Sequence, residues 1–412
     1  MKEKLSTEHL YNSVIWFLTV FLVMSFYIFA QYSWGKYVLA AVSTFVFFIS
    51  LFNYGGFIFK LGSFHFMVSF FAFYVATSAL WAISSGDALS KAKTLVEILV
   101  CMSLVYIHYY RTQDVYALVN SVKWAGNFVS VYAILYYGLD EMYRVLNDSG
   151  RIDGEFANIN SIGMLAAMAV VLNVYDVVVF KRFTWSLLFV VPSIIIIAGT
   201  ASKKAVLILL VGAVLVFVLK NFGKRISLQS VFKVLLSLIG IFFVFSIASK
   251  MSIFSGVVDR MSGLAALISG EGQLDASTNE RKEFIELGFE IFSENFVGGI
   301  GIGNPHILAA TEVGNDTYLH NNFVELLAGG GVLGFVIYYS IYVYLAYNII
   351  KYREADRNLF IIGWTLLVLV CMLDIALVSY YDKMTYFYFM ILFLCVEKMR
   401  SAFRIRGINI NE

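Results

Sequence analysis

Repeated apolar segments are the feature that most constrains this chain. Segments of about 20 predominantly apolar residues, the length that crosses a bilayer as a helix, recur along the sequence. We expect about twelve such spans, near residues 11–31, 35–52, 64–82, 92–110, 116–137, 160–180, 183–199, 205–219, 231–249, 329–350, 358–378 and 384–397. Hydrophobic residues make up 60% of the chain, whereas soluble domains are only about half apolar. The sequence therefore predicts an all-α polytopic protein that contacts the lipid bilayer.

The remaining composition excludes several classes of protein. A formal net charge of +2 and the lack of long Lys/Arg runs argue against nucleic acid as a partner. The three cysteines, Cys101, Cys371 and Cys395, lie in apolar runs, so they indicate neither a metal site nor a disulfide framework. The first apolar run has no small-residue cleavage site after it, and we interpret it as a retained span.

Basic residues in the connections predict the orientation, because cytoplasmic loops carry an excess of Lys and Arg. With the N-terminus inside, the inner connections and the tail hold Lys60, Arg111, Lys181, Arg182, Lys220, Lys224, Arg225, Lys351, Arg353, Arg357, Lys398, Arg400, Arg404 and Arg406. Both termini are therefore expected in the cytoplasm. Four outer segments break the pattern: Lys91 with Lys93, Arg144 with Arg151, Lys203 with Lys204, and Arg260 with Arg281 and Lys282. The first is partly balanced by Asp87, so the other three are the candidates for function.

One outer connection is too long to lack a role of its own. We divide the chain into residues 1–250, with nine spans and an outer loop near 138–158, residues 251–328, a long outer loop, and residues 329–412, with three spans and a cytoplasmic tail. Short amphipathic helices are expected near 257–268 and 279–296. In the second, Ile285, Phe289, Phe292 and Phe296 form an apolar stripe that we expect to face the membrane.

Two basic residues of that second helix have different neighbours. Lys282 has Glu286 four residues on, which predicts an ion pair on the helix surface. Arg281 has Phe284 and Ile285 at the corresponding positions, so it is available to an anion outside the helix. The alternative is an arginine that only extends to the membrane interface.

The segment "GGIGIG" that follows is rich in glycine and includes Gly301 and Gly303. Such a segment either packs its backbone closely against another element or offers amides to a phosphate. A nucleotide-binding loop is excluded because no strand precedes the segment and no Lys-Ser/Thr follows it.

A histidine and two asparagines, in "HNNFVELLAGGG", stand at the start of an apolar helix. We expect Asn322 to be the N-cap, since Glu325 three residues later completes a capping-box arrangement. His320 and Asn321 would then project from the helix mouth, where the helix dipole favours a neutral imidazole that can accept a proton. The alternative is a structural histidine that hydrogen-bonds loop backbone.

Two further outer segments complete a possible anion site. Arg151 and Asn160 lie near the start of the sixth span, and Lys203 and Lys204 lie between the seventh and the eighth. Together with Arg281 they could converge at one level of the membrane on a diphosphate.

At these positions the chain resembles the O-antigen ligase and polymerase superfamily of bacterial membrane glycosyltransferases. The resemblance covers residues 150 to 340 and rests on "RIDGEFANIN" (Arg151 to Asn160), Ser202-Lys203, Arg281, "GGIGIG", His320-Asn321, Glu325, Gly331 and Gly334. The family commonly has Ser-Arg where this chain has Ser202-Lys203. The lysine keeps the charge and loses the two-pronged geometry, so Lys204 could take the role instead.

The resemblance implies a GT-C-like membrane glycosyltransferase that uses an undecaprenyl-diphosphate-linked glycan at the outer face of the bacterial inner membrane, without metal or cofactor, and inverts the anomeric carbon. It implies that His320 is the general base and that Arg281, Arg151 and Lys203 bind the diphosphate. Asn160, Asn321, Glu325, Gly301 and Gly303 would contribute to the substrate site. A chain-length regulator is implied as a possible partner.

Several functions remain open. A polymerase of O-antigen or capsule repeat units is favoured over an O-antigen ligase by the aromatic, idiosyncratic sequence outside the motifs. A transporter or flippase is the alternative from another class, although it predicts internal repeats and charges at mid-membrane. A lipid-linked glycosyltransferase with acidic residues in its first outer loop is disfavoured, since "QYSWGK" has none. The sugar and the linkage are not encoded in any recognisable motif.

Overall fold

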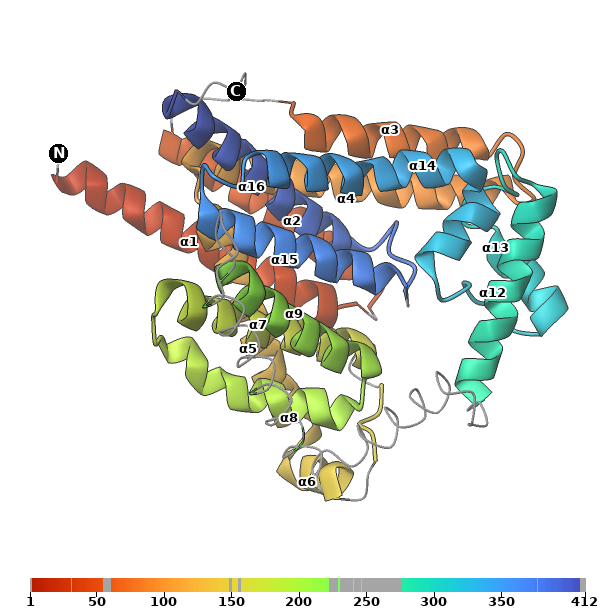
Figure 1. The fold of residues 1–412 in the computed structure, drawn as a ribbon, viewed down its shortest axis with the longest axis horizontal. Coiled ribbons are helices and arrows are strands. Elements are labelled where there is room, and N and C mark those ends of the chain that lie inside the picture. The colour runs from red at the N-terminus through yellow and green to blue at the C-terminus, as the bar shows by residue number, and fades with distance from the viewer. Residues whose placement is uncertain are drawn as a thin grey trace. The chain divides into compact units, whose positions relative to one another are not determined.

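The chain folds into helices (Figure 1). The computed structural model describes residues 2–30, 32–54, 61–147, 150–154, 157–221, 276–375 and 377–407, with isolated positions 229, 240 and 246. No strand occurs in these residues. The chain divides into two compact units, each assembled from three stretches of sequence. Unit 1 comprises residues 1–56, 114–272 and 357–369, and unit 2 comprises residues 57–113, 273–356 and 370–412.

Unit 1 is built around a buried central helix. Its elements are α1 (Lys2–Ile28), α2 (Gly35–Tyr54), α5 (Val115–Tyr137), α6 (Leu139–Asn147), α7 (Ile159–Tyr175) with a π-helical turn (Asp176–Phe180), a 3-10 turn (Trp185–Phe189), α8 (Val190–Thr200), α9 (Lys203–Asn221) and the first part of α15 (Arg357–Asp374). α7 packs on α5, α8 and α9. A Cβ at Gly163 would lie 2.6 Å from the Thr200 hydroxyl, and one at Gly212 2.6 Å from Val171, so small residues allow these apolar helices to approach closely.

Unit 2 contains four helices that pack on one another and a smaller group of elements that packs on one of the four. Its elements are α3 (Ser63–Ser78), α4 (Ser85–Thr112), α12 (Ala276–Glu294), α13 (Pro305–Leu308) with a π-helical turn (Ala309–Val313), α14 (Asn322–Lys351), the end of α15, and α16 (Lys383–Ile405). α14 is interrupted at Gly331, whose φ of 59° and ψ of −167° are not helical. The helix therefore has two parts, residues 322–330 and 332–351.

Every predicted span except the ninth overlaps a helix of the structure. Residues 231–249, the amphipathic helix expected near 257–268 and the basic residues Lys60, Lys224, Arg225 and Arg260 lie outside the described residues. Within the described ranges, six helices are long and apolar enough to cross a membrane: His9–Ile28, Gly35–Tyr54, Ile159–Phe180, Lys203–Asn221, Asn322–Lys351 and Arg357–Asp374. α3 and the segment Trp185–Thr200 are apolar but shorter. This agrees with a polytopic membrane protein, while the count of twelve and the GT-C-like arrangement stay predictions.

Candidate functional site

Arg151, one of the basic residues predicted in the outer loops of unit 1, contacts two other segments of that unit. Arg151 donates through Nε to the Thr200 carbonyl (3.0 Å) and through Nη2 to Oδ1 of Asn160 (2.8 Å). The backbone supports this arrangement, since the Ile152 amide donates to the Gly199 carbonyl (3.0 Å). Arg151 is therefore fixed between the end of α8 and the start of α7, as the predicted grouping with Asn160 requires.

Lys203 and Lys204 open the next helix. Ala201 turns the chain with a φ of 44°, and Ser202 accepts from the Ala205 amide through its hydroxyl (3.5 Å) at the start of α9. Both lysines are half-buried in the first turn of α9, where a helix dipole disfavours positive charge. An anion at this position would offset that cost, because helix N-termini bind anions through their free amides.

In unit 2, the two asparagines at the start of α14 have the opposite roles to those expected. Asn321 is the N-cap, and its Oδ1 accepts from the amides of Phe323 (3.0 Å) and Val324 (3.2 Å). The assignment of the cap to Asn322 was wrong. Asn322 is fully buried, and its side chain is bonded to residues outside α14's first turn. Asn321, predicted as a substrate-binding residue, therefore has a capping role.

Asn322 connects α14 to the loop between α15 and α16. Its Oδ1 accepts from the amides of Ser379 (2.9 Å) and Tyr380 (3.1 Å), and its Nδ2 donates to the Tyr339 hydroxyl (3.1 Å). The Tyr339 hydroxyl donates in turn to Asp374 (3.1 Å), a carboxylate with no solvent exposure. This buried network fixes the position of the helix mouth, because its polar groups have no water to replace a lost partner.

The two asparagines should therefore differ in their effect on stability. Asn322→Ala removes the partner of three buried donor and acceptor groups and should cost about 3 kcal/mol. Asn321→Ala removes a partly exposed cap and should cost about 1 kcal/mol. Thermal unfolding of the purified variants in one detergent should give the order wild type, Asn321→Ala, Asn322→Ala, from most to least stable. A larger loss of thermal stability for Asn321→Ala than for Asn322→Ala would contradict the assignment of Asn321 as the cap and of Asn322 to the buried network.

His320 precedes the cap and has a left-handed backbone, with a φ of 56°. Its ring lies against two aromatic rings, with centroids 4.4 Å from Tyr318 and 5.7 Å from Phe284 of α12. The side chain is half-buried. The helical spacing of the sequence did not indicate this left-handed turn.

Arg281 of α12 approaches the same tyrosine. Burial raises the pKa of the Tyr318 phenol, while the charge of Arg281 lowers it and the charge of Glu325 raises it further. Arg281 and Glu325 are therefore both close enough to act on Tyr318. His320 thus packs against Tyr318, and Arg281 and Glu325 act on the same tyrosine through their charges. The sequence motifs did not single out Tyr318.

α12 packs against α14 and the loop that leads into it. Phe284, Leu287 and Ile291 are buried with Leu319 and Val324 in one hydrophobic cluster. Of the predicted stripe, Ile285 packs against this cluster, Phe289 is 51% exposed, and Phe296, 56% exposed, lies beyond the end of α12. As predicted, Lys282 pairs with Glu286 (3.6 Å). The predicted stripe is therefore covered only in part.

A comparison with protein families gives a match in this part of the chain. Residues 187–339 match the model of the family described as Wzy_C, O-antigen ligase. This segment is similar to that family, and we call residues 187–339 the O-antigen ligase-family domain. The matched segment contains Lys203, Lys204, Arg281, Gly301, Gly303, His320, Asn321 and Glu325, whereas Arg151 and Asn160 precede it. A comparison with curated proteins finds no match.

The match is consistent with the O-antigen ligase and polymerase superfamily that the sequence resembles. With the apolar helices, it indicates a membrane protein and a glycosyltransferase-like enzyme of O-antigen processing. The match does not distinguish polymerase from ligase. In the O-antigen ligase-family domain, Arg281 comes from α12, His320 from the loop that leads into α14, and Glu325 from the first turn of α14.

Glu325 of this domain is buried and holds the loop before His320. Its Oε2 accepts from the Leu319 amide (2.9 Å), although the capping-box partner expected for it was the N-cap residue. Glu325 thus fixes the peptide between Tyr318 and Leu319, one residue before His320. Its predicted contact with substrate stays a prediction.

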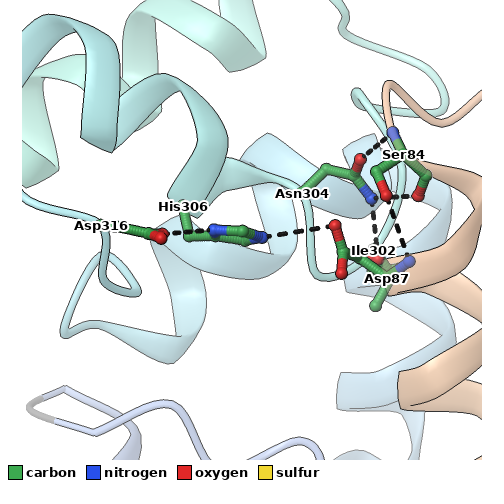
Figure 2. A network of polar contacts seen from close by, with 6 residues as sticks. All are labelled: Ser84, Asp87, Ile302, Asn304, His306 and Asp316. Atoms are coloured by element: carbon green, nitrogen blue, oxygen red, sulfur yellow. Dashed lines mark hydrogen bonds and ion pairs between the residues drawn. The ribbon is translucent and has the colours of Figure 1, made fainter.

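Figure 2 shows a second polar group that the sequence did not reveal. His306 lies between two carboxylates, with Nδ1 2.7 Å from Asp316 and Nε2 3.5 Å from Asp87 of α4. Beside it, buried Asn304 accepts from the Ser84 amide (2.5 Å) and donates to the Ser84 carbonyl (3.2 Å). These contacts attach the glycine-rich segment to the start of α4. In the sequence, only the "NPH" that follows the glycines marked the position of this polar group.

The glycines of the O-antigen ligase-family domain are used for close packing. Gly301 has a φ of 99°, and a Cβ there would lie 2.3 Å from Cβ of Ala82. At Gly303 a Cβ would lie 2.8 Å from Cγ of Lys91. Close packing of the backbone, the first of the two interpretations of "GGIGIG", therefore explains the glycines at 301 and 303. The contact of Gly301 and Gly303 with substrate stays a prediction.

Gly301 and Gly314 provide a matched pair for testing this packing. Both have positive φ, but a Cβ at Gly314 would meet nothing within 4 Å. Gly314→Ala should cost only the backbone strain, about 1 kcal/mol. Gly301→Ala adds a clash with the turn before α4 and should lower the thermal unfolding midpoint much further. Equal midpoints for the two variants would show that Gly301 is not packed against Ala82.

Proposed function

We propose that the chain is a polysaccharide polymerase of the bacterial inner membrane. It joins undecaprenyl-diphosphate-linked oligosaccharide repeat units of an O-antigen or capsule at the outer face, and both its termini are cytoplasmic. The observation that carries the proposal is the grouping of Arg281, Tyr318 and His320 within the O-antigen ligase-family domain. A basic group and a possible proton acceptor, both half-buried, are what transfer from a diphosphate donor needs.

In the proposed reaction, His320 accepts the proton of an acceptor-sugar hydroxyl as its oxygen attacks the anomeric carbon of the donor. The bond from that carbon to the diphosphate oxygen breaks, and undecaprenyl diphosphate leaves with the bonding electrons. A single displacement of this kind inverts the anomeric carbon and uses no metal or cofactor.

Arg281 is the residue proposed to bind the diphosphate beside His320 in unit 2. Within unit 1, Arg151 with Lys203 or Lys204 is proposed separately as a diphosphate-binding group. Their charge stabilises the leaving group most when negative charge has accumulated on it, so it lowers the barrier rather than only tightening binding. Asn160 holds Arg151 (2.8 Å) and has a supporting role. A chain-length regulator is proposed as a partner in the membrane.

An O-antigen ligase is the second candidate, because the matched family model carries that description. The ligase would transfer the same donor glycan to a lipid A core in place of a further repeat unit. The two reactions share the donor and the leaving group, so the residues around Tyr318 would serve either one.

The proposal is tested by supplying the purified full-length protein with lipid-linked repeat units. Lengthening of the glycan in the presence of a metal chelator and without nucleotide would support it. A product formed only when lipid A core is added would indicate the ligase, and movement of lipid-linked glycan across vesicle membranes without new linkages would indicate a flippase. In cells, loss of a polymerase should leave one repeat unit attached, whereas loss of a ligase should remove attachment.

A further inference from the structure

A cavity of about 860 Å³ lies in unit 2, at the opposite end of α3 from the glycine-rich segment. The Ile302 amide donates to Ser78 at the last residue of α3 (3.2 Å), whereas the cavity is lined by Ser63 at its first residue. Since α3 has 16 residues, its ends are about 24 Å apart. The cavity is therefore separate from the residues around Tyr318.

Positive charge is concentrated in this cavity on one helix. Arg400 of α16 is fixed by Glu397 (3.2 Å) and by the Tyr344 hydroxyl (3.1 Å), so it neutralises the one carboxylate in the lining. Arg404 lies one turn further on, exposed, and within the described part of the chain its guanidinium has no hydrogen-bond or ion-pair partner. After Arg400 has paired with Glu397, the positive charge of Arg404 remains in the cavity.

The start of α3 adds to this charge. Gly62 precedes the helix and has no side chain with which to cap it, and the first turn contains no acidic residue. The Gly62 amide donates to Nδ1 of His65 (3.2 Å), and no acidic side chain of the first turn offsets the partial positive charge of the helix N-terminus. The Ser63 hydroxyl lies 2.7 Å from the Tyr344 hydroxyl and holds the start of α3 against α14. An anion in the cavity would meet this helix end and Arg404 together.

The mouth of the cavity is apolar, which indicates the kind of anion. Leu61 and Phe66, both in the lining, are 68% and 72% exposed. Phe66 stacks on Phe70 with centroids 6.3 Å apart, and Phe73 continues the exposed apolar side of α3. A free phosphate ion would make no use of this surface, whereas acyl chains would lie along it.

We propose that this cavity binds the phosphate headgroup of an anionic glycerophospholipid, with Arg404 and the N-terminus of α3 as its main contacts and Phe66 and Phe70 against an acyl chain. Arg400 and Arg404 belong to the basic residues that predict the cytoplasmic side, so the lipid comes from the inner leaflet. Anionic lipids bind basic pockets between membrane helices on that side. The site stands apart from the proposed glycan transfer and does not depend on it.

The test compares lipid binding to the full-length protein by native mass spectrometry from detergent, with dioleoyl phosphatidylglycerol or dioleoyl phosphatidylcholine added. Wild type should bind phosphatidylglycerol at least about fivefold more tightly than phosphatidylcholine. Arg404→Gln should remove most of that preference. The matched control is Arg406→Gln, because Arg406 lies on the same tail, donates to the Glu354 carbonyl (3.2 Å) and does not line the cavity. The affinity of Arg406→Gln for phosphatidylglycerol should stay within about twofold of that of wild type.

Two results would overturn the proposal. Equal losses in Arg404→Gln and Arg406→Gln would mean that general surface charge, and not this cavity, attracts the lipid. Displacement of phosphatidylglycerol by millimolar inorganic phosphate in wild type, with no effect of Phe66→Ser on lipid affinity, would identify a site for a free anion. Weaker phosphatidylglycerol binding in Phe66→Ser, with phosphate unable to compete, is the result expected of a lipid site.

Discussion

Replacing His320 should abolish extension of lipid-linked repeat units, with a loss of about 10²-fold to 10⁴-fold in rate. The left-handed backbone at this position, with a φ of 56°, makes alanine an incomplete test because alanine also strains the turn. Asparagine adopts this conformation more readily than most residues and has no imidazole. His320→Ala and His320→Asn should therefore be equally inactive.

The control for this experiment is the folded state of each variant. Size-exclusion profiles and thermal unfolding midpoints of His320→Asn should remain close to those of wild type. If His320→Asn kept more than about a tenth of the wild-type rate, the imidazole would not be the general base, because loss of the base should lower the rate at least about 10²-fold. The histidine would then act through the turn and its packing on Tyr318 and Phe284.

The second large effect is expected at Arg281. Arg281→Ala should lower the rate of extension about 10²-fold or more, and Arg281→Lys should be nearly as damaging, since lysine cannot bind a diphosphate through two parallel hydrogen bonds. The measurement is the rate at saturating lipid-linked substrate together with its concentration dependence. A loss confined to substrate affinity would assign Arg281 to ground-state binding alone.

The neighbouring lysine provides the matched control. Lys282 pairs with Glu286 on the exposed side of α12, with both side chains more than 60% exposed. A surface pair of this kind contributes about 0–1 kcal/mol, so Lys282→Ala should leave extension within about twofold of wild type. Equal losses at Arg281 and Lys282 would refute the distinction between the two sides of the helix.

The sequence predicted those parts of the molecule that depend on short-range pattern. Apolar runs located the helices because a membrane span needs a continuous apolar segment. The ion pair of Lys282 with Glu286 and the contact of Arg151 with Asn160 join residues fewer than ten positions apart.

Contacts between distant segments could not be predicted in this way. Both Asn321 and Asn322 suit a cap, and only the amides of Ser379 and Tyr380 decide that Asn322 is used elsewhere. The same limit applies to His306, whose partner Asp87 is contributed by α4. The sequence did not indicate these two contacts because Ser379 and Asp87 lie more than 50 positions from Asn322 and His306.

The interleaving of the two units has a consequence for biosynthesis. Unit 1 needs residues 357–369, in which Arg357 donates to the Leu219 carbonyl (2.6 Å) and the Asn358 carbonyl accepts from Tyr175 (3.0 Å). A ribosome releases these residues only after 273–356, which belong to unit 2. The early helices α7 and α9 must therefore wait in the membrane for α15 while most of the other unit is still being inserted. A chain stalled before Arg357 would therefore leave both units unfinished.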